Sequence, residues 1–321
     1  FSYGLIDIDA NSIDGGYEIK SSVLKEIGLQ NGDQITSIND YKIDKVSDIR
    51  RYLIEAKTMT VFRAGRSKTI EFPTDFLGQL SASKPKGLIE LRNPFIFSAF
   101  QEGSINSSVD LQPGDVMVSI NNQPARFMDE ITPLLETLKD QVAVFSFKRN
   151  GNLITQELKV SNEAKLGVII ARSSQEYANA GFFKIIKKEY SFVESIEVGI
   201  KRFSLEMDSY WSQFKLIFTP STGAFKGVGG FKAIFDIFPN TWNWEAFWGR
   251  TALLSIMLGV LNLLPIPALD GGHVMFLIYE MISGRKPGDK FMEYAQTVGF
   301  FLLISLVLFA NGNDIYKALF G

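Results

Sequence analysis

Residues 262–271 read N-L-L-P-I-P-A-L-D-G and lie in the most apolar part of the chain. Two prolines, Pro265 and Pro267, stand between the polar Asn262 and the acidic Asp270. Proline lacks a backbone donor and clashes with the preceding turn, so a helix that reaches this stretch should break or unwind. Irregular backbone and ionisable groups at membrane depth typically indicate a functional site. We therefore expect such a site here.

One uncharged apolar run contains most of this stretch, and a second such run follows it. Residues 251–269 and 294–312 each have about the length that crosses a bilayer. The connection between them, residues 271–292, carries Arg285, Lys286 and Lys290, and such cations are enriched in cytoplasmic loops. We therefore expect this connection on the cytoplasmic side, and the first half of the chain and residues 313–321 on the outside. Just before the first run come three tryptophans, as in an aromatic belt at a membrane surface: Trp242, Trp244 and Trp248.

The first half of the chain contains a repeat. Residues 29–39 (L-Q-N-G-D-Q-I-T-S-I-N) are matched 82 residues later by L-Q-P-G-D-V-M-V-S-I-N, with seven of eleven positions identical. At the same offset, helical periodicity at 46–56 recurs at 128–138, and strand-like runs with turns follow both segments. A repeat of this length indicates a duplicated small domain and is too long for a solenoid unit.

Each copy of the repeat contains a Gly-Asp pair. Gly32 and Gly114 suit a tight turn that needs a positive φ angle. Asp33 and Asp115 can hold that turn by accepting hydrogen bonds from nearby backbone amides. These four residues are therefore interpreted as parts of the fold and not as a binding site.

The segment between the repeat and the apolar runs has mixed character. Residues 165–170 predict a last strand of the second copy, and residues 177–186 a Gly-punctuated connection. In residues 191–218, apolar side chains recur every three or four positions with too many charges between them for a span, which predicts an amphipathic helix. We expect it in the membrane interface, with ordinary packing against the repeated domains or against a transmembrane helix as the alternative. A flexible Gly-rich loop is expected at 220–230.

Composition excludes several classes of site. The formal net charge of −2 argues against nucleic acid as the main partner, and the absence of cysteine excludes disulfides and thiolate metal sites. The chain begins at Phe1 and holds 27 Phe but only one His, so we expect it to be a piece of a longer protein.

The repeated pattern resembles bacterial PDZ domains. In PDZ domains an extended peptide adds to a sheet edge beside a helix. By this resemblance, the loops that receive a peptide carboxylate correspond to residues 3–6 and 87–90, although neither has the full G-L-G-F pattern.

The pattern Asn262-x-x-Pro265-x-Pro267-x-Leu269-Asp270-Gly271 resembles the second signature of the site-2 protease family, zinc metalloproteases that cut substrates inside the membrane. With tandem PDZ domains upstream, the chain is similar to bacterial members that cleave membrane-anchored anti-sigma factors. The resemblance implies Zn²⁺ as cofactor and Asp270 as its third protein ligand. It also implies that Asn262 holds the substrate backbone, and that Pro265 and Pro267 shape the unwound segment at the substrate.

The chain departs from the family in one respect. The other family signature, H-E-x-x-H, would supply two His ligands and the Glu base, and it is absent; the single histidine is His273. Because the Glu base belongs to the absent signature, no catalytic residue is expected in this chain. A catalytic zinc needs three protein ligands, so we expect that about the first third of the protein is missing. Three residues beyond Asp270, His273 is interpreted as a residue that supports the site or as a polar loop residue.

The sequence thus predicts a multidomain α+β membrane protein of the bacterial inner membrane, with its PDZ domains in the periplasm. The predicted parts are two PDZ-like β-sandwich or barrel domains (1–80 and 84–172), an amphipathic interfacial helix (190–218), a Gly-rich loop and linker (219–246), and a membrane domain with two transmembrane helices (247–312). The expected partners are single-span membrane substrates and the lipid bilayer.

Three alternatives stay open. Asp270 could be the N-cap of a following helix, since Asp is a favoured capping residue. The protein could be a membrane-anchored PDZ scaffold without chemistry. A transporter with an unwound helix at an ion site fits the Asn and prolines but not a tandem PDZ arrangement.

Overall fold

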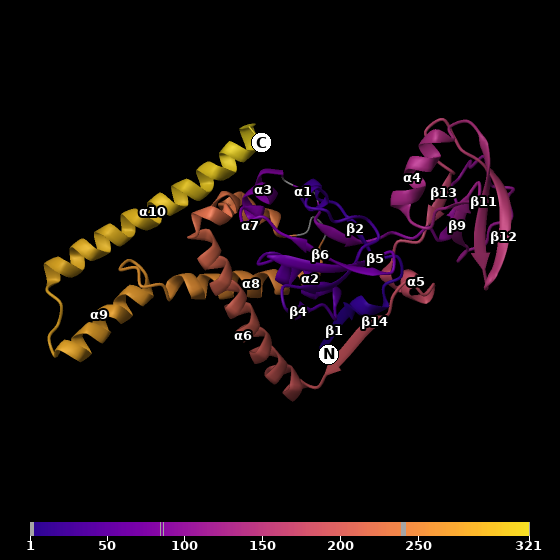
Figure 1. The fold of residues 1–321 in the computed structure, drawn as a ribbon. Helices are drawn as coiled ribbons and strands as arrows, with labels where there is room; N and C mark the ends of the chain where they lie inside the picture. Colours follow the sequence, from indigo (N-terminus) through magenta and orange to yellow (C-terminus); the bar gives the residue numbers. More distant parts are fainter. Residues whose placement is uncertain (1–2, 84, 86, 239–241, 321) are drawn as a thin grey trace. The chain divides into compact units, whose positions relative to one another are not determined.

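The computed structural model describes residues 3–83, 85, 87–238 and 242–320, and it has mixed α/β structure (Figure 1). The predicted domain starts at residues 1 and 84, and part of the predicted linker at 219–246, lie outside these ranges. The chain divides into two compact units. The first comprises Phe1–Phe76 and Ser83–Ser195, and the second comprises Leu77–Ala82 and Ile196–Gly321.

The first unit contains the duplication that the sequence predicts. Two antiparallel four-stranded sheets have the same strand order, β4-β3-β5-β6 and β10-β9-β11-β12. In the first copy these are β3 (Gln34–Ile38), β4 (Tyr41–Lys42), β5 (Thr58–Arg63) and β6 (Arg66–Glu71), with helix α2 (Val46–Leu53). In the second copy they are β9 (Val116–Ile120), β10 (Gln123–Pro124), β11 (Val142–Arg149) and β12 (Asn152–Lys159), with helix α4 (Met128–Thr137). We call these copies the first and second repeat.

The Gly-Asp turns have the predicted conformation. Gly32 and Gly114 have φ angles of 91° and 96°. One carboxylate oxygen of Asp33 accepts the amide of Gln30 at 2.9 Å, and Asp115 accepts the amide three residues before it at 2.8 Å. Both aspartates are buried. The prediction that these residues build the fold is therefore confirmed.

Shorter strands complete the first unit. β2 (Tyr17–Ile19) pairs with β7 (Ile89–Leu91), β8 (Phe97–Phe100) with β13 (Val168–Ile170), and β1 (Tyr3–Ile8) with β14 (Ile185–Tyr190). The short helices are α1 (Ser22–Glu26), α5 (Ser174–Asn179) and the 3-10 helix η1 (Ala10–Ser12). Residues 177–186, expected as a connection, thus include the end of α5 and the start of β14. Residues 3–6 lie within β1, and residues 87–90 lead into β7.

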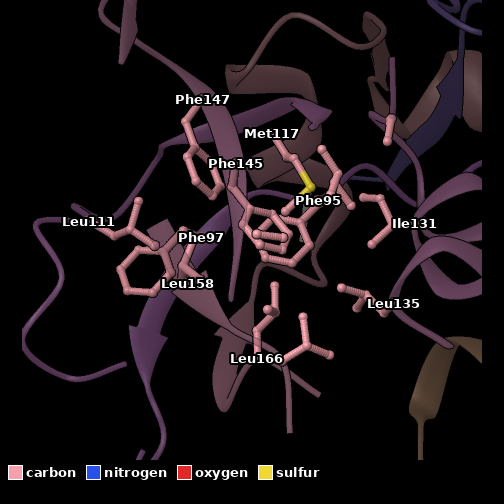
Figure 2. Close-up of a cluster of buried hydrophobic side chains, with 14 residues drawn as sticks. Phe95, Phe97, Leu111, Met117, Ile131, Leu135, Phe145, Phe147, Leu158 and Leu166 are labelled. Carbon is pink, nitrogen blue, oxygen red and sulfur yellow. The ribbon is translucent and has the colours of Figure 1, made fainter. Parts of the chain in front are cut away.

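The core of the second repeat is rich in phenylalanine. Figure 2 shows side chains from several strands and from α4 converging on one cluster, in which Phe145, Phe147 and Met117 are fully buried. Burying a side chain of this size stabilises the fold by about 1.5–3 kcal/mol. The apolar positions that alternate along β11 therefore account for much of this repeat's stability.

The two repeats are joined by a buried arginine. Arg92 follows β7, and its guanidinium donates two hydrogen bonds to Asp129 of α4, at 3.0 and 2.9 Å. It also lies 2.6 Å from Glu130 and 4.1 Å from the centre of the Phe127 ring. The same guanidinium donates to the carbonyl of Gly15 in the first repeat at 3.3 Å. Arg92 thus binds both repeats at once.

The second unit is helical. Its elements include α6 (Phe192–Ile217) from Ile196 onward, α7 (Phe231–Asp236), α8 (Trp244–Asn262), α9 (Asp270–Ser283) and α10 (Asp289–Phe320), with the 3-10 helices η2 (Pro220–Thr222) and η3 (Ala224–Gly227). Most of α3 (Phe76–Ser83), whose sequence position is between the repeats, belongs to this unit. A Cβ atom at Gly223 would lie 2.6 Å from the Cα atom of Gly78, so α3 and the loop at Gly223 pack backbone to backbone.

The helices differ from the prediction in two places. Residues 271–292, expected as a connecting loop, are mostly α9, and the expected Gly-rich loop contains η2 and η3. That loop is held by α10, where Asn313 donates to the carbonyls of Lys226 and Val228 at 3.1 and 2.6 Å. The carboxylate of Asp314 accepts the amide of Gly230 at 2.9 Å. The helix expected at 191–218 is present as α6.

Within the described residues, one helix is long and apolar enough to cross a membrane, at Asp289–Tyr316. The apolar part of α8, Ala246–Asn262, is shorter. The prediction of two membrane spans, at residues 251–269 and 294–312, therefore stays a prediction.

Candidate functional site

The motif begins where α8 ends. Asn262 is the last residue of α8, and the amide of Leu263 still bonds to the carbonyl of Gly259 at 3.1 Å. The helix then stops, because Pro265 has no amide to continue the ladder. The amide of Ile266 instead bonds to the carbonyl of Leu264 at 2.7 Å, which closes a tight turn around the proline. The predicted helix break is thus confirmed, and we call residues 263–269 the motif loop.

Two glycines at the start of α9 support the motif loop. A Cβ atom at Gly271 would lie 2.3 Å from the carbonyl oxygen of Leu264 and 2.4 Å from that of Leu263. A Cβ atom at Gly272 would lie 2.3 Å from the carbonyl oxygen of Ile266. Real Cβ atoms do not approach oxygen this closely, so the backbone of the motif loop rests directly on these two residues. Any residue larger than glycine at position 271 or 272 would displace the motif loop.

Asp270 lies between this loop and α9. It is the first residue of α9, and the N-cap is Leu269, which makes no side-chain capping bond. The Asp270 side chain is exposed, and within the described residues no hydrogen bond or ion pair involves its carboxylate. The interpretation of Asp270 as an N-cap is therefore wrong. Its carboxylate stands at a helix N-terminus, where the aligned peptide dipoles favour negative charge.

The other predicted site residues lie on the same turn of chain. Asn262 and Pro265 are exposed and Pro267 is half-buried. The side-chain amide of Asn262 has no hydrogen-bond partner within the part of the chain that the structure describes. His273 is exposed, and its ring lies edge-on to that of Phe276 at 6.3 Å between centroids. The structure thus brings the motif residues together around one backbone break.

The described residues do not form a complete zinc site. No group of three His, Cys, Asp or Glu residues that could hold a metal occurs among them. Asp270 offers carboxylate oxygen, which is a suitable zinc ligand, so it fits as one member of a set of three.

Sequence reasoning missed one neighbour of the motif loop. Gly299 of α10 is buried, and a Cβ atom there would lie 2.9 Å from the amide nitrogen of Ala268. No local signal distinguishes Gly299 from other helix glycines. The Gly271-Gly272 pair, in contrast, could have been recognised because two glycines open a helix, where they lower helix propensity.

The comparisons with known proteins agree with the motif. The zinc metalloprotease RasP of Shouchella clausii is 30% identical over 221 residues, which cover 67% of this chain and 50% of RasP. Two further relatives carry zinc metalloprotease in their names. SA1105 of Staphylococcus aureus is 30% identical over 70% of this chain and 55% of its own length. FN1322 of Fusobacterium nucleatum is 26% identical over 77% of this chain and 71% of its own length.

These names imply Zn²⁺ as the cofactor of the relatives. The chain spans about half the length of RasP and SA1105. The family model of peptidase family M50, the site-2 protease family, matches residues 51–306, which is most of the chain. With this match and the motif at residues 262–271, the chain belongs to peptidase family M50.

Proposed function

We propose that this chain is part of a zinc-dependent intramembrane endopeptidase in which Asp270 is one of three zinc ligands. The observation that carries the proposal is the Asp270 carboxylate, which is exposed and has no partner among the described residues. It follows directly on an unwound loop in a helical unit. A carboxylate with only a structural role would be expected to cap the helix or pair with a cation.

The two remaining ligands and the general base would come from an H-E-x-x-H helix outside this chain. A bound zinc supplies a Lewis acid that polarises the scissile carbonyl and lowers the pKa of water. The residues of this chain would position the substrate. Asn262 at the end of α8, whose side-chain amide has no partner among the described residues, would donate a hydrogen bond to the substrate backbone. Pro265 and Pro267 keep the motif loop unwound, so an extended substrate can lie beside it.

The surroundings support a membrane location. α10 contains a segment long and apolar enough to span, and α8 adds a shorter apolar helix. Trp242 just before α8, and Trp244 and Trp248 in its first turns, are exposed, as expected at a membrane surface. We propose two membrane spans in the bacterial inner membrane, with α6 in the interface and single-span proteins such as anti-sigma factors as substrates. Exposed Phe192, Ile196, Ile200 and Phe203 would contact lipid.

The two repeats would act as PDZ domains on the periplasmic side and restrict access. Their link through Arg92 supports a filter that responds as one body. A series of model substrates with external domains of increasing size tests this. Cleavage should fall as the external domain grows, and size-independent cleavage would refute the filter.

The metal assignment is tested by Asp270→Ala in the full-length protein. Bound zinc and cleavage of a model transmembrane substrate should both be lost. Asp289→Ala is the matched control, since Asp289 is also an exposed first residue of a helix in the same unit, α10. This control should keep both properties.

Equal zinc content in the two variants would contradict the proposal. In that case Asp270 has another role, and the membrane-anchored scaffold becomes the better interpretation. Loss of zinc in both variants would also count against it, since the effect would not be specific to the motif.

A further inference from the structure

Gly299 is the point at which α10 contacts the motif loop. A Cβ atom at residue 299 would lie 2.9 Å from the amide nitrogen of Ala268, 3.2 Å from its Cβ and 3.4 Å from Cγ2 of Ile266. The nearest of these atoms is backbone, so it cannot rotate away as a side chain would. Any residue larger than glycine therefore moves the loop or the helix.

The surroundings of Gly299 set it apart from the rest of α10. Gly299 is buried, whereas the adjacent Val298 and Phe300 are 66% and 54% exposed. Glycine in a helix interior costs about 1 kcal/mol relative to alanine. Such a residue weakens α10 by itself, and the close approach to Ala268 gives a physical reason for its presence.

The motif loop is thus held from two sides. The carbonyls of Leu263, Leu264 and Ile266 rest on Gly271 and Gly272 of α9, and Ala268 rests on Gly299 of α10. Asp270 follows this loop directly, and one residue, Leu269, separates it from Ala268. A shift of Ala268 is therefore transmitted to the Asp270 carboxylate through two peptide units.

We propose that Gly299 is a positioning residue that fixes the place of the Asp270 carboxylate. This rests on the proposed function, in which Asp270 binds zinc. Residues that orient a metal ligand change metal affinity by about 10- to 100-fold when they are replaced. Gly299 would act in this way through the backbone, without contact to the metal.

The test compares Gly299→Ala with Gly312→Ala in the full-length protein. Both glycines lie within α10, but a Cβ atom at Gly312 would have nothing within 4 Å. Both substitutions raise helix propensity equally. The contact of the new Cβ atom with the motif loop at residue 299 therefore distinguishes the two variants. Zinc retained after equilibration with a chelator should indicate affinity about 10- to 100-fold weaker in Gly299→Ala and unchanged in Gly312→Ala.

A second readout follows the loop without metal. Because this chain has no cysteine, Leu263→Cys gives it one thiol, in the motif loop, where Leu263 is 71% exposed. The same full-length protein with Leu263 unchanged gives the background labelling. The rate of maleimide labelling in zinc-free protein should change in the Gly299→Ala background and stay constant in the Gly312→Ala background.

The outcomes separate the two claims. If Asp270→Ala loses zinc but Gly299→Ala retains it as Gly312→Ala does, the positioning role is wrong and the metal assignment stands. If Asp270→Ala retains zinc, the proposed function is wrong whatever Gly299→Ala does. An unchanged labelling rate in the Gly299→Ala background overturns the role of Gly299.

Discussion

Each buried aspartate of the repeats is bound by an arginine from a neighbouring strand. Arg63 donates to both oxygens of Asp33, at 2.5 and 2.7 Å, and Arg149 donates to both oxygens of Asp115, at 2.8 and 2.7 Å. The hydrogen bonds to Asp115 raise the pKa of Arg149, so the guanidinium keeps its charge at any ordinary pH. The two repeats therefore share the same buried ion pair.

Asp33→Asn should destabilise the first repeat. The substitution keeps the shape of the side chain but leaves the Arg63 guanidinium without its counter-charge. Because Arg63 is 22% exposed, we expect the free energy of unfolding to fall by about 2 kcal/mol, below the cost of a fully buried pair. Hydrogen exchange of the β3 and β5 amides measures the change. Asp44→Asn, in the exposed pair with Lys42, should leave the exchange unchanged.

The pH dependence of the second repeat should follow Glu130. Burial raises the pKa of this carboxyl, but hydrogen bonds from the amides of Arg126 and Phe127 and from Arg92 outweigh that effect and leave the pKa below its usual value of 4.5. A lowered pKa stabilises the folded state above about pH 4.5, and this contribution is lost as the pH falls through the lowered pKa.

Thermal unfolding at a series of pH values should show this loss below pH 4.5. In Glu130→Gln the contribution is absent, so its unfolding temperature should be lower at neutral pH and fall less on acidification. Parallel pH curves for the two proteins would contradict the assignment.

At the residue scale, the local chemistry of the site was predictable from sequence. The helix break at Pro265 and the turn at Asp33 each depend on backbone groups within a few residues. The partners Arg63 and Gly299 lie about 30 residues away along the chain, and only the packed structure brings them close. The sequence pattern carries no signal for such distant contacts.

At the element scale, the hairpin turns offer a comparison built into the chain. The β5–β6 turn has Ala64 and Gly65 at φ angles of 47° and 81°, and the β11–β12 turn has Asn150 and Gly151 at 49° and 87°. Two consecutive positive φ angles define the turn that matches the twist of a hairpin, for which Asn-Gly is preferred. The first repeat therefore places alanine where its Cβ is strained.

Exchanging these two residues should change stability in opposite directions. The left-handed conformation costs a residue other than Gly, Asn or Asp about 1 kcal/mol. Ala64→Asn should stabilise the first repeat by about 0.5–1 kcal/mol, and Asn150→Ala should destabilise the second by a similar amount. Denaturant unfolding checks both. Both side chains are exposed, so effects of equal sign would show that packing and not the turn decides.

Element prediction failed where pairing or context is non-local. β14 pairs with β1, more than 170 residues earlier, and a short run of Ile, Lys, Glu and Tyr shows no strand pattern without that partner. α9 opens with two glycines, which disfavour a helix by themselves. The motif loop packed on those glycines offsets this cost in the folded chain.

At the scale of the whole molecule, Arg92 decides whether the repeats unfold together. The side chains of Arg92 and Asp129 are 7% and 8% exposed. The side-chain amide of Asn31 in the first repeat also donates to the Asp129 carboxylate, at 2.8 Å. Removing one partner of a buried ion pair costs about 3–5 kcal/mol. Arg92→Ala should therefore weaken the link between the repeats more than it weakens either core.

We expect the two repeats to unfold in one transition in the unmodified protein and in two separate transitions in Arg92→Ala. Hydrogen exchange of the β5 and β11 amides reports the unfolding of each repeat. Arg126→Gln is the control at the same boundary, because its pair with Asp14 is half-exposed, with side chains 38% and 47% accessible. That variant should keep one transition. One transition in both variants would mean that the pairing of β2 with β7 suffices to couple the repeats.

The path of the chain between the two units has a consequence for limited proteolysis. The chain passes between the units three times, after Phe76, after Ala82 and after Ser195. A cut after Ser195 leaves α3 packed against the loop at Gly223. A cut after Phe76 or after Ala82 leaves the strand pairs β2–β7 and β1–β14 intact. A nicked molecule would therefore migrate as two fragments under denaturing conditions but as one particle in native buffer.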